Sequence, residues 1–282
     1  MKCAREGFRS TLCRAPGRPY AKLTSPMLSA TIKARREQLR ALDNEKGLQF
    51  SRIVVSGKLK NQRKLLLYFG KYIKKTDNER YTRLEELAKS LGQFEKKAVA
   101  VSASNINDAR NELLGIEGIS GRLYWEGIQE IIKGKVEFFG RINRGATDKV
   151  NSMLNYGYGI LYSQVWGAVV SAGLEPFAGF LHVDRPGKPS LVLDLVEEFR
   201  QPVVDRTVVS HVNLGEAINM EGGLLDADTR KSISRKILER LESRETYSGK
   251  KYQIRSIIQI QARCLASFLR GEKEYNPFSF KW

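Results

Sequence analysis

Apolar residues recur at helical spacing along most of the chain from about residue 26 onward. Positions three, four and seven residues apart share one face of an α-helix, so the pattern predicts helices that each bury one face. A first helix is expected over 26–43, after a Ser-Pro pair, and a second over 46–75. The remaining helices are expected at 81–97, 104–132, 147–173, 189–212, 226–243 and 250–271.

Interruptions of this pattern predict turns and loops. Polar residues, Gly and Pro gather in KKTDNE (74–79), KGK (133–135), DRPGKP (184–189) and MEGG (220–223). Segments 133–146 and 174–188 are expected to be loops or short extended pieces, and GEKEYNPFSFKW (271–282) an irregular tail. The first 25 residues look non-helical, with RPYAKL (18–23) as a strand remnant. The predicted fold class is therefore mainly α, with little β structure.

Composition narrows the choice of partner more than the choice of fold. The 282 residues carry 48 Lys and Arg against 31 Asp and Glu, a net charge of +17 that favours nucleic acid or an anionic membrane surface. The most apolar segment contains Glu175 and Pro176, and no run reaches the roughly 18–20 apolar residues of a spanning helix. The start is not a secretory signal, and the three cysteines have no metal-type spacing. We expect a soluble cytoplasmic protein that binds a polyanion, not a membrane.

Candidate chemistry lies in GFLHVDRPGKPSLVLDLVEEFR (179–200), which contains one of only two histidines. Asp194 and Glu197 are three residues apart, so both can lie on one face of a helix, with His182 folded back over it by the DRPGKP turn. Carboxylates and a neutral imidazole suit Mg²⁺ or Mn²⁺. Spacing alone leaves the alternative open: solvated carboxylates and a structural histidine.

A third candidate ligand is Glu117, within GIEGISGRLYW (115–125). The glycines at 115, 118 and 121 lower helix propensity by about 1 kcal/mol each, which is tolerable where backbone or a ligand approaches closely. A kinked helix with an exposed glutamate is the alternative.

These motifs, in this order, carry a family resemblance. GIEG, NYGYG, GFLH and LDLVEEFR resemble the CRISPR-associated endonuclease and integrase of spacer acquisition, over roughly residues 17–275. The resemblance implies that Glu117, His182 and Glu197 bind a divalent metal, Mg²⁺ or Mn²⁺, and are catalytic, with Asp194 as an accessory acid. It also implies DNA and a small second CRISPR-associated protein as partners, and a homodimer.

The implied reaction is metal-dependent phosphoryl transfer on DNA, as hydrolysis or strand transfer. The 3′-hydroxyl of a short protospacer would attack a phosphodiester at a CRISPR repeat, as part of antiviral defence. The chain has no recognisable Cys–His or Ser–His–Asp motif to suggest a covalent route. A non-catalytic, basic DNA-binding subunit of the acquisition complex is the alternative, and a basic RNA-binding protein would need an RNA-recognition module that is not found.

Basic residues near these motifs are candidates for contact with the DNA backbone. They are Lys188 and Arg185 in the DRPGKP turn, and Arg141, Arg144 and Lys149 in GRINRGATDK. Two longer stretches add to them: 33–64 has ten Lys or Arg against three acids, and 227–255 has nine against four. A solvated helix surface is the ordinary alternative for any one of these residues.

Aromatic residues repeat at helical spacing within 147–173. Core packing is the favoured interpretation and a stacking platform for unpaired bases the alternative. The residues are Tyr156, Tyr158, Tyr162 and Trp166.

The N-terminus departs from the family pattern. The family begins with a β domain, whereas residues 1–25 resemble only its last helix and strand, so we divide the chain into a β-domain remnant (1–25) and an α-helical catalytic domain (26–282). A strand without its neighbours leaves backbone groups unpaired. The helix-like KCAREGF and strand-like RPYAKL would then have almost nothing to pair with. We expect weakened dimerisation, and full integration impaired more than simple nuclease activity.

Overall fold

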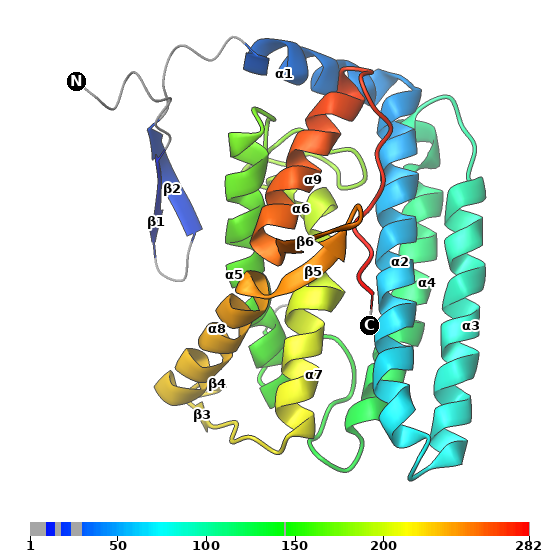
Figure 1. Cartoon of the computed structure of the whole chain (residues 1–282), viewed down its shortest axis with the longest axis vertical. Coiled ribbons are helices and arrows are strands. Elements are labelled where there is room, and N and C mark those ends of the chain that lie inside the picture. The colour runs from blue at the N-terminus through cyan, green and yellow to red at the C-terminus, as the bar shows by residue number, and fades with distance from the viewer. Residues whose placement is uncertain (1–9, 15–17, 24–29, 144, 282) are drawn as a thin grey trace.

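The computed structural model describes residues 10–14, 18–23, 30–143 and 145–281. As Figure 1 shows, it is mainly α-helical, which confirms the predicted fold class. The helices are α1 (Ala30–Arg40), α2 (Glu45–Ile73), α3 (Asn78–Ala100), α4 (Ile106–Ile132), α5 (Lys149–Ser171), α6 (Ser190–Val196), α7 (Arg206–Asn213), α8 (Ala227–Glu242) and α9 (Ile254–Leu269). A 3₁₀ turn, η2 (Ala41–Asp43), joins α1 to α2, and a π-helical segment, η3 (Arg200–Asp205), precedes α7.

The helices form two groups that meet at a polar cavity. The long helices α2, α3 and α4 lie side by side, and α2 contacts both of the others (Figure 1). On the other side, α5 contacts α6, α8 and α9. The C-terminal tail runs back between α9 and α2, where Pro277 lies against Gly57. The two groups share one apolar core, which includes Phe50, Tyr124 and Phe199 at 0% exposure.

Local sequence explains where most helices begin. At five N-termini an Asn or Asp side chain accepts a hydrogen bond from a backbone N–H of the first turn, which would otherwise lack a partner. These caps are Asn44, Asp77, Asn105, Asp148 and Asp226. The helices they start match the expected ones to within a few residues. Within the described residues, no helix combines the length and the apolarity needed to cross a membrane.

The single helix predicted over 189–212 is wrong: the chain forms α6, a turn at 197–199, η3 and α7. Pro202 explains the interruption, because proline has no N–H to donate to the carbonyl four residues earlier. That carbonyl, on Glu198, instead accepts a hydrogen bond from Asn61 Nδ2 at 2.9 Å. The segment between α6 and α7 begins with Glu197 and ends with Asp205, and Arg200 is the first residue of its π-helical part.

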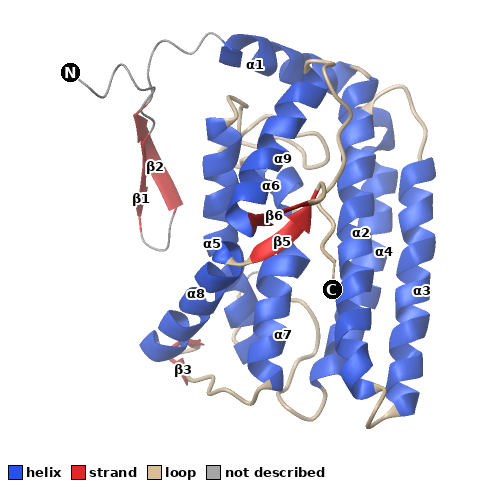
Figure 2. Ribbon diagram, in the orientation of Figure 1, coloured by secondary structure: helices blue, strands red, loops and turns tan. Residues whose placement is uncertain are grey.

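The helix predicted over 250–271 begins four residues late, because residues 250–253 form a strand. Strands β5 (Arg244–Tyr247) and β6 (Lys250–Gln253) pair as an antiparallel hairpin (Figure 2). Its two-residue turn has Ser248 at φ 49° and Gly249 at φ 79°, the left-handed geometry that hairpin turns require. A shorter hairpin, β3 (Met220–Glu221) with β4 (Leu224–Leu225), encloses the expected MEGG turn.

The strand expected at RPYAKL is confirmed as β2 (Arg18–Leu23). The expectation that it lacks a partner is wrong, because β2 pairs antiparallel with β1 (Ser10–Arg14). This hairpin lies beside α5 in Figure 1, and β2 contacts that helix. The helix-like KCAREGF lies outside the described residues.

Candidate functional site

A polar cavity of about 230 Å³ lies where the two helix groups meet. Charged and aromatic side chains from α2, α4, α5, η3, the GFLH segment and the turn after α6 line it together. Among them are Lys58, Glu117, Tyr158, His182, Glu197 and Arg200. The three predicted metal ligands, Glu117, His182 and Glu197, are therefore brought to one cavity from positions far apart in the sequence.

Asp194 fixes the position of His182. Its fully buried carboxylate accepts the backbone N–H groups of Phe180 (2.6 Å), Leu181 (3.1 Å) and His182 (2.9 Å), and lies 2.7 Å from His182 Nδ1. Because a carboxylate accepts, Nδ1 carries the proton and Nε2 is the nitrogen available to a ligand in the cavity. Burial acts to lower the pKa of His182, but the neighbouring Asp194, Glu197 and Glu117 together raise that pKa. Asp194 thus acts through His182 and does not line the cavity, in keeping with the predicted accessory role.

The close approach that allows this arrangement depends on Gly179. A Cβ at this position would lie 2.6 Å from backbone and side-chain atoms of Ser190, at the start of α6. The backbone N–H of Gly179 donates to Ser190 Oγ at 3.0 Å. The GFLH segment therefore packs directly on α6, which carries Asp194.

The two glutamates share a cation supplied by the chain itself. Lys58 Nζ lies 2.5 Å from Glu117 Oε1 and 2.7 Å from Glu197 Oε2, and Arg200 Nε lies 3.1 Å from Glu197 Oε1. Burial opposes ionisation of Glu197, yet Arg200 and Lys58 lower its pKa to about 2. Glu197 is therefore a carboxylate, and the side chains of both glutamates contact the ammonium of Lys58.

The contacts to Glu197 are ion pairs by distance but lack hydrogen-bond geometry. As a result Glu197 Oε2, on a side chain 2% exposed, is buried without a hydrogen-bond partner. Buried polar atoms are rarely left in this state, so an orphaned carboxylate oxygen aimed at a cavity marks a place for a further ligand.

The residues fit a divalent cation in chemistry, although not in their present spacing. Across the described residues, no three His, Cys, Asp or Glu side chains stand together as a ready metal site. Lys58 lies in the cavity with them, its ammonium within ion-pair distance of both Glu117 and Glu197. Two carboxylates and an oriented imidazole remain a donor set that Mg²⁺ or Mn²⁺ accepts.

A second buried network forms one wall of the cavity. Asp205 accepts hydrogen bonds from the hydroxyl groups of Tyr124 (2.7 Å) and Tyr158. The guanidinium groups of Arg141 and Arg200 lie 5.2 and 4.8 Å from the centre of the Tyr158 ring. Burial raises the pKa of Asp205 despite the two hydroxyl donors. The wall therefore presents two guanidinium groups, held by one tyrosine, beside the carboxylates.

The predicted DNA-contacting residues take different positions. Arg141 lines the cavity and donates to Asn151 Oδ1 (2.9 Å) and Asn155 Oδ1 (2.5 Å). Arg185 is exposed and Lys188 half-buried in the expected turn, which is closed by a 2.9 Å hydrogen bond between their backbones. Lys149 is exposed at the first residue of α5. Arg144 lies outside the described residues.

An open hollow of about 480 Å³ adjoins the cavity along α4. Gly118 and Gly121 line it with Trp125, and a Cβ at either glycine would meet no atom within 4 Å. No protein segment among the described residues approaches these glycines, so they keep a surface channel open instead of a helix contact. Phe139, 89% exposed, stands at its edge.

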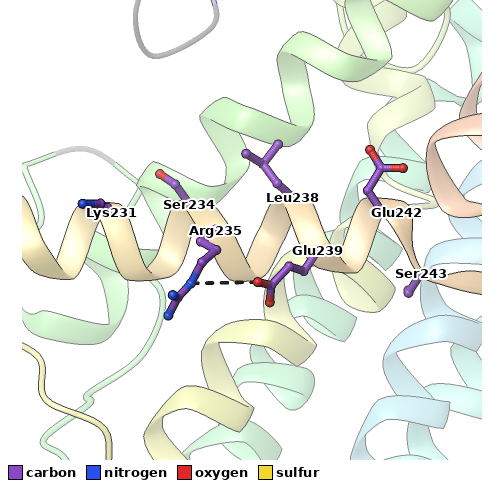
Figure 3. A pocket seen from close by; sticks show the side chains of 7 residues that line it. All are labelled: Lys231, Ser234, Arg235, Leu238, Glu239, Glu242 and Ser243. Atoms are coloured by element: carbon purple, nitrogen blue, oxygen red, sulfur yellow. Dashed lines mark ion pairs between the residues drawn. The ribbon is translucent and has the colours of Figure 1, made fainter.

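A larger hollow, about 750 Å³, lies along the outer face of α8 (Figure 3). Lys231 and Arg235, two of the predicted basic residues, are exposed there, but Arg235 is paired with Glu239 at 3.9 Å, and Lys236 with Glu216. A single helix lines this surface, and its charges do not converge on one point as those around Glu197 do. Convergent groups define a reactive site better than volume does.

The aromatic residues of α5 are partly buried and pack against the core, as favoured from the sequence. Three members of the site, Lys58, Arg200 and Asp205, were not expected from the sequence. Arg200 had a usable signal, because it follows Glu197 by three residues. Lys58 had no such sequence signal beyond its position on the buried side of a basic helix.

Comparison with known proteins identifies the family. The model of the family "CRISPR associated protein Cas1" matches residues 1–239, and the chain belongs to this family. The CRISPR-associated endonuclease Cas1 1 of Archaeoglobus fulgidus is 37% identical over 279 residues, which cover 94% of this chain and 80% of the relative. The resemblance found in the ordered motifs is thereby confirmed.

Solved structures share the fold. A casposase bound to integration product superposes with a TM-score of 0.75 at 23% identity, covering 97% of this chain and 79% of that one. A chain of a Cas6-RT-Cas1–Cas2 complex gives a TM-score of 0.75 at 21% identity, covering 98% of this chain and 30% of that one. At these identities the likeness concerns the fold.

Proposed function

We propose that the chain is a metal-dependent DNA endonuclease and integrase that inserts short DNA spacers into a CRISPR array. The observation that carries the proposal is the convergence of Glu117, Glu197 and an Asp194-oriented His182 on one cavity. The endonuclease named among the relatives and the DNA-bound casposase among the structural neighbours support the same activity.

Glu117, Glu197 and Nε2 of His182 are the groups that would hold Mg²⁺ or Mn²⁺. The chemistry that such a cation supplies when bound is polarisation of the scissile phosphate and a lower pKa for the attacking hydroxyl. Glu197 is ionised without it, since the cations beside this side chain lower its pKa to about 2. Asp194 keeps the imidazole in the tautomer that offers Nε2.

Other residues of the chain are suited to bind and orient the DNA. Arg200 and Arg141 face the cavity, where a guanidinium can bind two phosphate oxygens at once. Lys188, Arg185 and Lys149 carry further positive charge, and the open hollow beside α4 offers room for a strand that leads to the cavity.

The proposed partners are DNA and a small second CRISPR-associated protein. The net charge of +17 supports DNA as a partner. The solved Cas6-RT-Cas1–Cas2 complex, one chain of which shares this fold, supports the second protein. We propose that the protein acts in the cytoplasm, where the free thiol of Cys264 is stable. A homodimer, which the family resemblance implies and which we expect to be weakened, stays a prediction.

A second candidate function is a non-catalytic DNA-binding subunit. It is favoured by one observation: the carboxylates are already neutralised by Lys58, and no ready metal cluster stands in the described residues. Such a protein would bind branched DNA but would not cut it with any divalent cation.

The deciding experiment measures cleavage of branched DNA and strand transfer of a labelled protospacer into a repeat plasmid, with Mn²⁺ or with EDTA. We expect both reactions with Mn²⁺ only, and neither with Glu117→Ala or His182→Ala, which should still bind DNA. Glu137→Ala, at an exposed position, is the matched control. Cutting by Glu117→Ala at the wild-type rate would show the site to be misplaced, and binding without cutting by the wild type would favour the second candidate.

A further inference from the structure

We propose that Lys58 is a built-in counter-ion that occupies the metal position and must leave it before a divalent cation binds. The inference rests on the proposed function, because it concerns the same two carboxylates. In this proposal Lys58 lowers the affinity of the site for a divalent metal ion.

The geometry places the Lys58 ammonium between the two ligands. Its Nζ is 2.5 Å from Glu117 Oε1 and 2.7 Å from Glu197 Oε2, and the side chain is 11% exposed. A metal ion bound by both carboxylates needs oxygen atoms at about 2.0–2.2 Å, so it and the ammonium cannot occupy the same position. The two cations therefore compete for one place.

The charges around the cavity also indicate that a divalent cation would replace the Lys58 ammonium rather than bind beside it. The carboxylates of Glu117 and Glu197 carry two negative charges, and Lys58 and Arg200 supply two positive ones within ion-pair distance. The site is therefore balanced without a metal, and a divalent cation added to it would leave an excess of two positive charges. A partly buried site disfavours such an excess, because unpaired charge is costly away from water.

Lys58 can leave without rearranging the helices. Its side chain is a flexible four-carbon stem on α2, whereas Glu117 is on α4 and Glu197 follows α6. Arg200 does not compete in the same way, because it contacts Oε1 of Glu197, while Lys58 forms an ion pair with Oε2, the oxygen that has no hydrogen-bond partner.

The test is a direct measurement of metal binding, independent of DNA cutting. Free Mn²⁺ is titrated by electron paramagnetic resonance against the wild type and Lys58→Met, and the thermal unfolding of both is followed in EDTA. We expect Lys58→Met to bind Mn²⁺ at least tenfold more tightly. In EDTA it should unfold at a lower temperature, because the two carboxylates then repel each other. A merely structural role for Lys58 would weaken metal binding instead of tightening it.

Two further variants keep the result interpretable. Lys58→Gln keeps a hydrogen-bond donor without the charge, and should also bind Mn²⁺ more tightly if Lys58→Met does not fold. Lys46→Met makes the same change on the same helix, where Lys46 donates to the carbonyl of Leu269, and should leave Mn²⁺ affinity unchanged.

The outcomes separate the two proposals. Mn²⁺ bound by the wild type, but no more tightly by either Lys58 variant, would overturn the role of Lys58 and leave the metal site standing. Absence of Mn²⁺ binding by every variant would overturn the metal site itself, and this inference with it.

Discussion

Glu198 stands beside the proposed metal ligand Glu197, and its replacement by Gln should change how stability depends on pH. The Glu198 carboxyl is fully buried and joins the C-terminal tail to the site. Its Oε1 accepts the Tyr275 hydroxyl at 2.5 Å, and its Oε2 accepts Gln261 Nε2 at 2.7 Å and the N–H of Phe278 at 2.8 Å. Burial raises the pKa of Glu198 from 4.5 to about 7, with these hydrogen bonds offsetting part of the effect.

The direction in which stability changes with pH depends on whether the folded or the unfolded protein holds the proton on Glu198. Between pH 4.5 and 7 the folded protein keeps Glu198 protonated while the unfolded chain has released the proton, so stability falls as the pH rises through this window. The stability that the protonated Glu198 carboxyl contributes is fully present below pH 4.5 and lost above pH 7. A shift of about 2.5 pKa units at 1.36 kcal/mol each corresponds to roughly 3 kcal/mol.

Glu198→Gln keeps the shape and cannot ionise, since its amide can donate to the Tyr275 oxygen while its carbonyl accepts from Gln261 and Phe278. Thermal unfolding of both proteins in EDTA from pH 4.5 to 8 measures the difference. We expect the wild type to lose stability relative to Glu198→Gln by about 3 kcal/mol across this range, a difference of several degrees in Tm. Parallel pH profiles would refute the reasoning. Glu137→Gln, at an exposed glutamate, should give the wild-type profile.

Three further predictions concern the site and its DNA. Asp194→Ala should lower Tm as well as activity, because three buried N–H groups and His182 lose their acceptor; an unchanged Tm in thermal unfolding would contradict this. Gly179→Ala should destabilise the protein and weaken Mn²⁺ binding in a titration, because its Cβ would lie 2.6 Å from Ser190; wild-type affinity would show that the segment can shift freely. DNA affinity, measured by duplex titration at several salt concentrations, should fall with a log–log slope of about −0.9 per phosphate neutralised, and a flat response would mean that the charge of +17 serves another partner.

The helices could be predicted from sequence where their signals are local. Helices α2, α4 and α5 have long apolar faces and Asn or Asp caps, and they begin and end close to the expected residues. The errors occur where a single residue overrides the periodicity. Pro202 interrupts the helix expected over 189–212, and Ser248-Gly249 turns the chain into a hairpin where a helix start was expected. The apolar residues around Pro202 favoured an unbroken helix, and the helix of residues 254–269 was expected to extend over the polar residues 250–253.

The candidate site was only partly predictable, for a different reason. Glu117, His182 and Glu197 belong to short ordered motifs, so they could be recognised together. Lys58 contacts Glu117 from 59 residues away along the chain, within a helix that resembles an ordinary basic surface helix. Nothing local separates it from the other lysines of that helix, because its role arises only when α2 packs against α4.

The C-terminal tail has a consequence for the order in which the protein becomes competent during synthesis. Every side chain that lines the cavity lies between residues 58 and 201, yet two of the three donors to Glu198, the neighbour of Glu197, are Tyr275 and Phe278. Tyr275 and Phe278 are synthesised after every residue that lines the cavity. A chain that has made the lining residues but has not yet folded this segment back against α2 therefore has the cavity without the enclosed Glu198 carboxyl beside it.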